Sequence, residues 1–136
     1  PKQFDRFIWP HMEKILNFTS DNDLKFYFMV EGNAGALVSH FGDFTKGACL
    51  LHPELDSLEE LMQKFGDRFA YAGGMPVDIL GSVSRNECVR YTKSVLDKYA
   101  EAGNFVFTTN KGIVFKCDAT EDNLKAVCDT VNSYGF

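Results

Sequence analysis

The feature of this sequence that most restricts its fold is a regular alternation of short apolar runs with longer amphipathic ones. The apolar runs cover residues 24–30, 47–51, 68–73 and 104–109. Strands that read as nearly continuous apolar runs are typical of a parallel sheet. Neighbouring parallel strands need a crossover, which the amphipathic segments between the runs supply. The pattern therefore predicts an α/β fold of parallel strands alternating with helices.

Three of the amphipathic segments begin with a hydroxyl residue that can cap a helix, and two of these carry Glu three positions later, as in a capping box. Two of them also end at a glycine, which commonly terminates a helix. The segments are residues 57–66 (Ser57, Glu60, Gly66), 84–103 (Ser84, Glu87, Gly103) and 120–135 (Thr120).

The remaining segments are assigned as follows. A helix is predicted over residues 3–20, where Pro10 either kinks the helix or marks its true start. Residues 34–41 predict a short helix, residues 52–56 a turn and residues 74–81 a loop. Because no linker or low-complexity segment interrupts the chain, we expect one domain over residues 1–136.

Four strand–helix units form either a small open sheet or half of a (β/α)₈ barrel, which needs about 250 residues in full. In both architectures ligands bind where the strands end at their carboxyl edge. The residues that follow the four predicted strands are therefore the candidates for function.

Composition excludes several classes of function. The chain has 136 residues, 45% of them hydrophobic, with a net charge of −5 and a pI near 5.1. Such a chain can bury a core, but it offers no basic surface for nucleic acid or anionic lipid. No apolar stretch reaches the roughly 20 residues of a membrane span. We therefore expect a small-molecule substrate, with no nucleic-acid or membrane partner.

The four cysteines, Cys49, Cys88, Cys117 and Cys128, show neither a C-x-x-C motif nor metal-ligand spacing with histidine. We interpret them as reduced core thiols of a cytoplasmic protein, with disulfides as the alternative. Cys117 follows the fourth strand and is the one cysteine near the expected site. The chain starts at Pro1 without Met, which favours a fragment, a processed product or an incomplete chain.

Polar residues stand at each predicted strand end. The four junctions are Glu31-Gly32-Asn33, His52-Pro53-Glu54, Gly73-Gly74-Met75-Pro76 and Thr109-Asn110-Lys111-Gly112. Glu31, His52 and Lys111 would give an acid, a titratable base and a cation around one cavity, a set that could bind a carboxylated substrate or move a proton. Asn33, Gly73, Gly74 and Asn110 are the candidates for substrate binding.

Each of these residues also has a simpler explanation. Polar residues end strands routinely, because the chain there meets water. Gly73 and Gly74 could let backbone N–H groups approach an anion, but a tight turn explains two glycines equally well. No phosphate-binding glycine motif is present.

The ordered junctions resemble the uroporphyrinogen decarboxylase superfamily, which also includes corrinoid-linked methyltransferases. Its most specific matches here are F-G-D-R-x-A followed by G-G, at residues 65–74, and D-x-x-x-x-N-L-x-A, at residues 118–126. The resemblance implies a (β/α)₈ barrel, of which this chain would be the C-terminal half. It therefore also implies that the missing N-terminal half, or a second copy, completes the barrel.

The sequence departs from both activities of that superfamily. The zinc-dependent methyltransferases carry H-x-C-G-N where this chain has Met29, Glu31, Gly32 and Asn33, and their third ligand falls near Ile113. We therefore expect no metal site of that kind. The decarboxylases carry G-H-G where this chain reads Asn110-Lys111-Gly112, and the Asn of their G-N-L-D-P turn is absent from residues 73–76.

The resemblance suggests methyl transfer as the favoured role, because Glu31-Gly32-Asn33 is closest to the methyltransferase C-G-N. A corrinoid or folate-type carrier would then be held by a partner, with no cofactor bound by this chain. The alternatives are uroporphyrinogen decarboxylation and a non-catalytic half-barrel that binds or assembles. A free-standing four-stranded α/β domain that shares only the fold is a further possibility.

Overall fold

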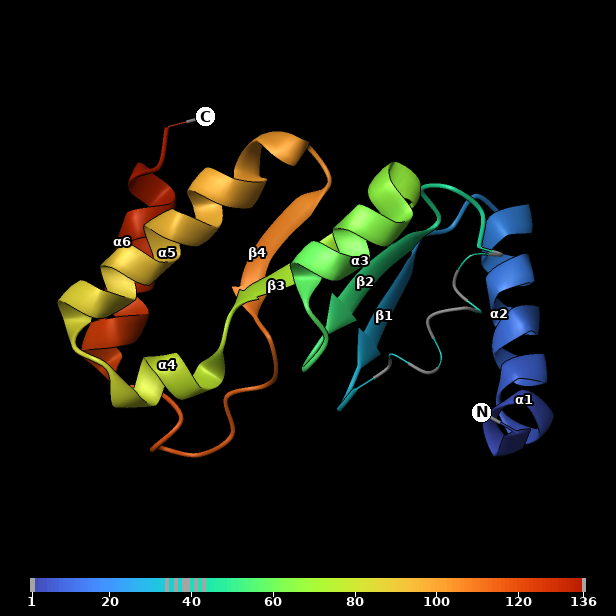
Figure 1. The fold of residues 1–136 in the computed structure, drawn as a ribbon, viewed down its shortest axis with the longest axis horizontal. Coiled ribbons are helices and arrows are strands. Elements are labelled where there is room, and N and C mark those ends of the chain that lie inside the picture. The colour runs from blue at the N-terminus through green and yellow to red at the C-terminus, as the bar shows by residue number, and fades with distance from the viewer. Residues whose placement is uncertain are drawn as a thin grey trace. The chain divides into compact units, whose positions relative to one another are not determined.

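Four parallel strands form one sheet, and helices alternate with the strands along the chain (Figure 1). The structure is a computed structural model that describes residues 2–33, 35, 37, 40, 42 and 44–135. The strands lie in the order β1-β2-β3-β4, which is their order in the sequence. They are β1 (Phe26–Val30), β2 (Cys49–Pro53), β3 (Ala70–Met75) and β4 (Phe105–Thr109). The predicted α/β fold is confirmed, and the arrangement is consistent with half of a (β/α)₈ barrel.

The chain divides into two compact units, Pro1–Tyr71 and Ala72–Phe136. β3 begins in the first unit and continues in the second. The single domain expected from the sequence stays a prediction.

The first unit starts with two helices, α1 (Lys2–Phe7) and α2 (Trp9–Asp21). The predicted helix over residues 3–20 is therefore broken at Ile8. Pro10 lies in the first turn of α2, where its missing N–H removes no helical hydrogen bond. Of the two roles predicted for Pro10, the start of a helix is confirmed.

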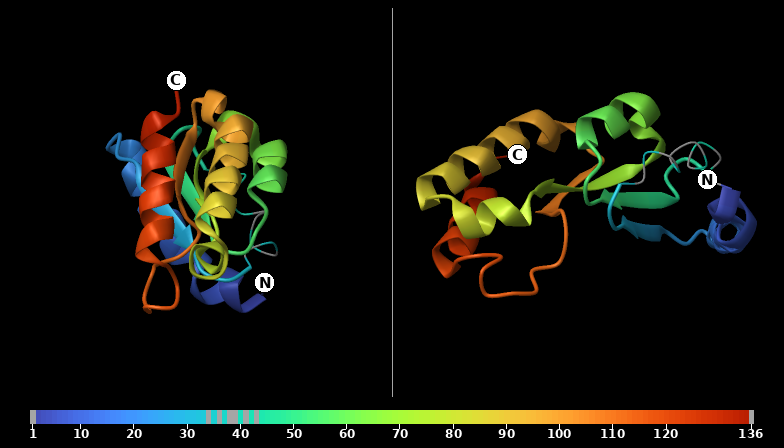
Figure 2. Two further views of the ribbon diagram at one scale, coloured as in Figure 1. Left: turned by 90° about the vertical axis from the view of Figure 1, so that its left-hand side faces the viewer. Right: turned by 60° about the horizontal axis from the view of Figure 1, so that its bottom comes forward.

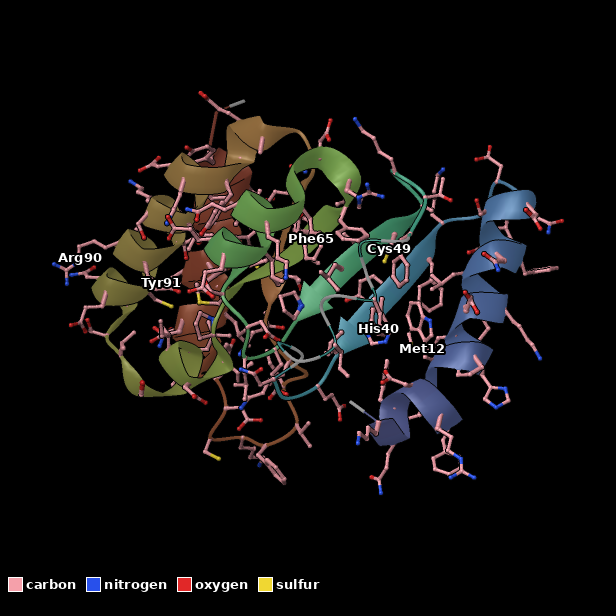
Figure 3. The ribbon with its side chains drawn as sticks, turned by 45° about the vertical axis from the view of Figure 1, so that its right-hand side comes forward. Met12, His40, Cys49, Phe65, Arg90 and Tyr91 are labelled. Atoms are coloured by element: carbon pink, nitrogen blue, oxygen red, sulfur yellow. The ribbon has the colours of Figure 1, made fainter. Side chains whose placement is uncertain are left out.

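An aromatic cluster joins these helices to the segment that precedes β2. His40, labelled in Figure 3, lies with its ring centroid 4.6 Å from that of Trp9 and 5.4 Å from that of Phe4. Its Nε2 lies 2.9 Å from Oδ1 of Asp5. Trp9 also stacks on the buried Phe44. The helix expected over residues 34–41 lies largely outside the described residues.

α3 (Leu58–Phe65) lies on one side of β1 and β2 (Figure 2). Its predicted ends are confirmed, because Oγ of Ser57 accepts a hydrogen bond from the N–H of Glu60 and Gly66 follows the last turn with φ 55°. A short 3₁₀ helix, η2 (Gly66–Arg68), leads into β3. The hydroxyl of Tyr71 donates to the backbone oxygens of Leu61 and Gly66, which ties β3 to α3.

The register between the strands decides which side chains face α3. β1 and β2 pair with Tyr27 beside Leu50 and Met29 beside His52, and Leu51 of β2 pairs with Tyr71. Paired residues of neighbouring strands face the same side of a sheet, and Tyr71 is hydrogen-bonded to the α3 side, so Leu51 also faces α3. Side chains alternate along a strand, so Leu50 and His52 face the opposite side. Tyr27, Met29, Leu50 and His52 therefore share the face opposite α3, which we call the open face.

The second unit contains α4 (Val77–Ser82), α5 (Arg85–Tyr99), a 3₁₀ turn η3 (Ala100–Ala102) and α6 (Glu121–Ser133). α5 and α6 run side by side in both Figure 1 and Figure 2. A buried cluster of Met75, Leu80 and Cys88 lies between β3, α4 and α5.

The helix ends predicted for this unit are confirmed. Ser84 and Glu87 form both hydrogen bonds of a capping box at the start of α5, and Gly103 follows η3 with φ 72°. Oγ1 of Thr120 accepts from the N–H of Asn123 at the start of α6.

The prediction of a loop over residues 74–81 is wrong, because α4 occupies most of it. Pro76 stands at the N-cap, and Val77 and Leu80 are buried on the inner side of this short helix. Burial of these two side chains outweighs the weak helix propensity of a segment that contains Gly81. Among the described residues, no helix has both the length and the apolar character needed to cross a membrane.

Candidate functional site

The end of β1 is a rigid turn built around Gly32. Its N–H donates to Oε2 of Glu54 at 2.7 Å, and its backbone oxygen accepts from the N–H of Leu55 at 3.3 Å. Gly32 has φ 74°, a conformation that favours glycine. Both backbone groups of the turn are thus fixed by the segment that follows β2.

Glu31 and Asn33 flank that glycine, and both side chains are exposed. Oδ1 of Asn33 accepts from the N–H of Gly35 at 2.9 Å, a hydrogen bond typical of an Asx turn. Among the described residues, none makes a hydrogen bond or ion pair with the carboxylate of Glu31. The structure therefore presents an available carboxylate on a fixed backbone at this strand end.

His52 does not lie in a turn after β2, as the sequence suggested, but within the strand. It pairs with Met29, and the strand continues to Pro53. Proline lacks the backbone N–H that the interior of a strand needs, but Pro53 is tolerated because it is the last residue of β2. The prediction of a turn over residues 52–56 is therefore wrong for its first two residues.

The imidazole of His52 is buried, with 3% of the residue exposed. Its Nδ1 shares a hydrogen bond with the hydroxyl of Tyr27, and the two ring centroids are 5.8 Å apart. Tyr27 itself is 53% exposed on the open face. Tyr27 could not be recognised from the sequence, because a hydrogen bond between residues 25 positions apart depends on the register of β1 against β2.

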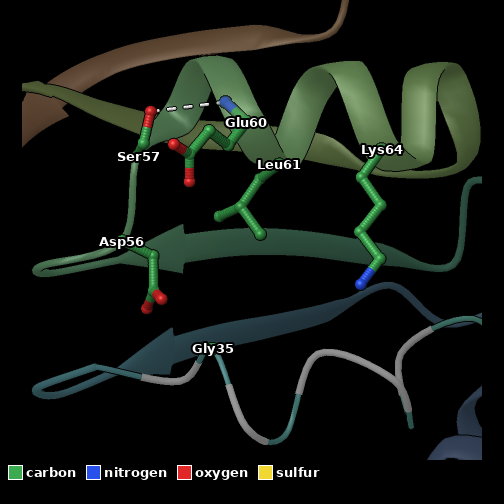
Figure 4. A pocket seen from close by; sticks show the side chains of 6 residues that line it. All are labelled: Gly35, Asp56, Ser57, Glu60, Leu61 and Lys64. Carbon is green, nitrogen blue, oxygen red and sulfur yellow. Dashed lines mark hydrogen bonds between the residues drawn. The ribbon is translucent and has the colours of Figure 1, made fainter.

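A cavity of about 170 Å³ lies between α3 and Gly35 (Figure 4). Side chains from one face of α3 line it, together with the two residues before the helix and one glycine. These residues are Gly35, Asp56, Ser57, Glu60, Leu61 and Lys64. Two carboxylates and one ammonium group make the cavity suited to small charged groups.

In the second unit, Asn110 holds the start of α4. Its backbone N–H donates to the oxygen of Met75 at 2.9 Å, and its Oδ1 accepts from the N–H of Val77 at 2.9 Å. Val77 is the first residue of α4, so this bond satisfies one of the donors that a helix start leaves unpaired. The structure thus gives Asn110 an architectural role, and its predicted role in substrate binding stays a prediction.

Lys111 lies next to this cap. Its Nζ is 3.7 Å from Oδ1 of Asp78, whose side chain is almost fully exposed. An ion pair of this length at a solvated surface contributes little to stability. The ammonium group of Lys111 therefore lies near the end of β4, beside the carboxylate of Asp78.

Gly73 and Gly74 have φ values of 138° and 101°, which favour glycine. A Cβ on Gly74 would lie 2.7 Å from Cγ1 of Val95 and 3.1 Å from Cζ of Phe105. Close packing of β3 against α5 and β4 therefore explains Gly74. The predicted contact of both glycines with a substrate stays a prediction.

The segment after β4 presents three consecutive apolar side chains to solvent. Ile113, Val114 and Phe115 are all exposed, Val114 to 74%. The backbone N–H groups of Val114 and Phe115 both donate to Oδ2 of Asp118 at 2.8 Å. We call residues 113–115 the apolar loop. Hydrogen bonds to Asp118 hold its backbone, while its side chains are exposed.

The cysteines are free thiols, as predicted, but only two of them lie in the core. Cys49 and Cys88 are buried, whereas Cys117 and Cys128 are exposed. Burial raises the pKa of Cys49 to about 12, so it is no nucleophile at neutral pH. The prediction of a core position is wrong for Cys128, because its position on α6 turns away from the buried stripe of Asn123, Ala126 and Thr130.

Glu31 and His52 both belong to the first unit, at the carboxyl end of the β1–β2 pair, while Lys111 belongs to the second. Their convergence on one cavity stays a prediction. Among the described residues, no three side chains of His, Cys, Asp or Glu come together as a metal site. The expected absence of the zinc site also stays a prediction.

Comparison with known proteins identifies a family. The family model for uroporphyrinogen decarboxylase (URO-D) matches residues 1–134, almost the entire chain. No curated protein and no solved structure shows a significant match.

Proposed function

Because the chain belongs to the uroporphyrinogen decarboxylase family, we propose that it supplies active-site residues to a methyl-transfer enzyme of that family. The observation that carries the proposal is the available carboxylate of Glu31 on the fixed turn at the end of β1. The substrate is a small molecule, and the methyl carrier is a corrinoid or a similar group held by a partner.

Glu31 acts in this proposal through its charge. A methyl group bound to nitrogen, oxygen or sulfur transfers most easily when the heteroatom carries positive charge, and a carboxylate beside that charge stabilises it. The N–H of Gly32 is hydrogen-bonded to Glu54, so the turn that carries Glu31 is already held in place before the substrate binds. Asn33 lies two residues further and would contact the uncharged part of the same molecule.

Lys111 and His52 have separate roles in the proposal. Lys111 would bind an anionic group of the substrate through the charge of its ammonium group. His52 would act from within β2 through Tyr27, its partner on the open face. No step of the proposal passes through a zinc ion.

The test uses the full-length protein with methylcobalamin as methyl donor and a small thiol as acceptor. Demethylation of the cobalamin, followed by its visible spectrum, is expected for the wild-type protein. Glu31→Gln should lower kcat/KM by about 100- to 1000-fold, the usual effect of removing one electrostatic contact in a transition state. Glu13→Gln, an exposed carboxylate on α2, is the matched control and should retain full activity. Consumption of uroporphyrinogen without any methyl transfer would overturn the proposal.

Decarboxylation of uroporphyrinogen is the second candidate, and Lys111 is the observation that favours it. An ammonium group near the end of β4 could hold a propionate carboxylate in place of the family histidine. In that case Lys111→Ala should raise KM for uroporphyrinogen, whereas Lys111→Arg should retain most of the binding.

A non-catalytic assembly role is the third candidate. The open face exposes Tyr27 and Met29, and an uncovered apolar sheet face favours association. The partner would be the other half of the barrel or a second copy of this chain. Light scattering behind a sizing column distinguishes them: a dimer of the 136-residue chain supports the second copy.

A further inference from the structure

Tyr27 and His52 form a polar pair on the open face that the proposed function does not yet explain. Tyr27 lies beside Leu50 in the register, and His52 lies two residues further along β2. The phenol must therefore lean towards the carboxyl end of β1 to reach Nδ1 of His52. The hydroxyl thus lies at the level of Met29, two residues before Glu31.

The two partners differ sharply in exposure. His52 is 3% exposed and Tyr27 is 53% exposed, with the tyrosine ring packed against the imidazole. In neutral histidine one ring nitrogen accepts a hydrogen bond, and the phenol is a donor that suits it. A buried base is thereby linked by one hydrogen bond to a hydroxyl on an accessible residue.

We propose that Tyr27 and His52 together act as the base that deprotonates the methyl acceptor, a small molecule with a thiol group. This inference rests on the proposed methyl transfer and on the prediction, made from Met29 and Ile113, that the zinc site of the related methyltransferases is missing here. A thiol is a poor nucleophile until its proton leaves. If that prediction holds, no metal lowers the thiol pKa, and a general base has to remove the thiol proton.

The proposed step moves two protons, one from the thiol to Tyr27 and one from Tyr27 to His52. The S–H bond of the acceptor breaks, and its electron pair stays on sulfur and forms the new bond to the methyl carbon. The thiol proton passes to Oη of Tyr27, while the original hydroxyl proton of Tyr27 passes to Nδ1 of His52. The methyl donor keeps the electron pair of the bond that breaks. His52 then returns its proton through Tyr27 to water.

In this inference the acceptor binds on the open face beside Met29. Met29 lies on that face beside His52 and is partly exposed, so an apolar part of a small molecule can rest on it. A thiol bound there comes within reach of the Tyr27 hydroxyl. Tyr27 is then a catalytic residue, and His52 acts through it.

One test measures the pair without any methyl transfer. N-acetylimidazole acetylates accessible tyrosine hydroxyls, and peptide mass spectrometry gives the rate at each site. If His52 takes the Tyr27 proton, His52→Gln should slow acetylation of Tyr27 by at least about tenfold, since general-base assistance typically contributes 10²–10⁴. Tyr134, whose hydroxyl donates to Asp97, is the internal reference and should react equally in both proteins.

An unchanged rate at Tyr27 would overturn the inference. His52→Asn, with its amide near the position of Nδ1, serves as the second variant if thermal unfolding shows that His52→Gln does not fold.

A second test uses the methylcobalamin and thiol assay with Tyr27→Phe, which keeps the ring and removes the hydroxyl. The expected result is a fall in kcat of about 10²- to 10⁴-fold with little change in KM for the thiol. A variant with unchanged kcat would overturn the inference while leaving methyl transfer intact. Conversely, acetylation that depends on His52 in a protein without methyl transfer would reject the proposed function and retain the pair.

Discussion

A Cβ built on Gly81 would lie 2.1 Å from the backbone oxygen of Cys117, so α4 and the segment before α6 touch backbone to backbone. The contact cannot relax by moving a side chain. On the same segment, the N–H of Thr120 donates to the oxygen of Leu80 at 3.2 Å. Only glycine fits at position 81 unless this segment shifts.

Gly81→Ala should therefore destabilise the protein by about 1–3 kcal/mol, the usual range for overpacking. Gly112→Ala is the control, because its nearest neighbour would be Cγ2 of Val114 at 3.9 Å. Urea unfolding of the two variants gives the comparison. Equal midpoints for both variants would show that the segment moves freely.

Asn123 is expected to be a second point of attachment for α6. Its buried Nδ2 donates to the oxygens of Leu80 and Val83, each at 2.9 Å. Asn123→Ala leaves both carbonyls without this donor and should cost about 1–3 kcal/mol for each buried group left unsatisfied. Asn132→Ala, exposed on the same helix, should change the free energy of unfolding by less than about 0.5 kcal/mol.

Thiol reactivity should divide the cysteines into two pairs. Cys117 and Cys128 are exposed and should react with Ellman's reagent within minutes. Cys49 and Cys88 are buried, and burial raises the pKa of both thiols. Two thiols should therefore react in the native protein and four in denaturant. Rapid reaction of all four under native conditions would contradict the burial of β2 and α5.

The pH dependence of stability should include a contribution from Asp118. The backbone N–H groups of Phe115 and Val114 lower the pKa of its carboxyl group below the ordinary value of 3.8. Its ionised form is thus favoured in the folded state, and its contribution is complete above pH 3.8 and lost as the pH falls through the lowered pKa. Asp118→Asn should flatten the acid limb of the stability curve, measured by thermal unfolding from pH 2 to 6. An acid limb identical to that of the wild-type protein would refute the assignment.

The elements of the fold were largely predictable because local chemistry marks them. Ser84 with Glu87, and Thr120 before α6, define helix starts within a few residues and without any tertiary information. α4 escaped prediction because its start depends on Asn110, a residue 33 positions away from Val77. A six-residue helix carries too little periodicity of its own to be recognised.

Only the candidate residues that follow a predicted strand could be named from the sequence. Glu31 and Asn33 could be selected as candidates because they lie within three residues of the end of an apolar run. Tyr27 was not, since it lies inside such a run and gains its polar partner from the register of β1 with β2. The end of β2 was also misplaced, because the apolar run ends at Leu51 while the strand continues through His52 to Pro53.

The apolar loop has a practical consequence for anyone who concentrates this protein. Since Asp118 already fixes the backbone of Val114 and Phe115, copies that meet through this loop lose little conformational freedom. Sulfate and similar salts are excluded from protein surfaces and strengthen such contacts. Salting-out and crystal nucleation should therefore begin at residues 113–115, and a single polar replacement at the exposed Phe115 would widen the range of conditions in which the protein stays dispersed.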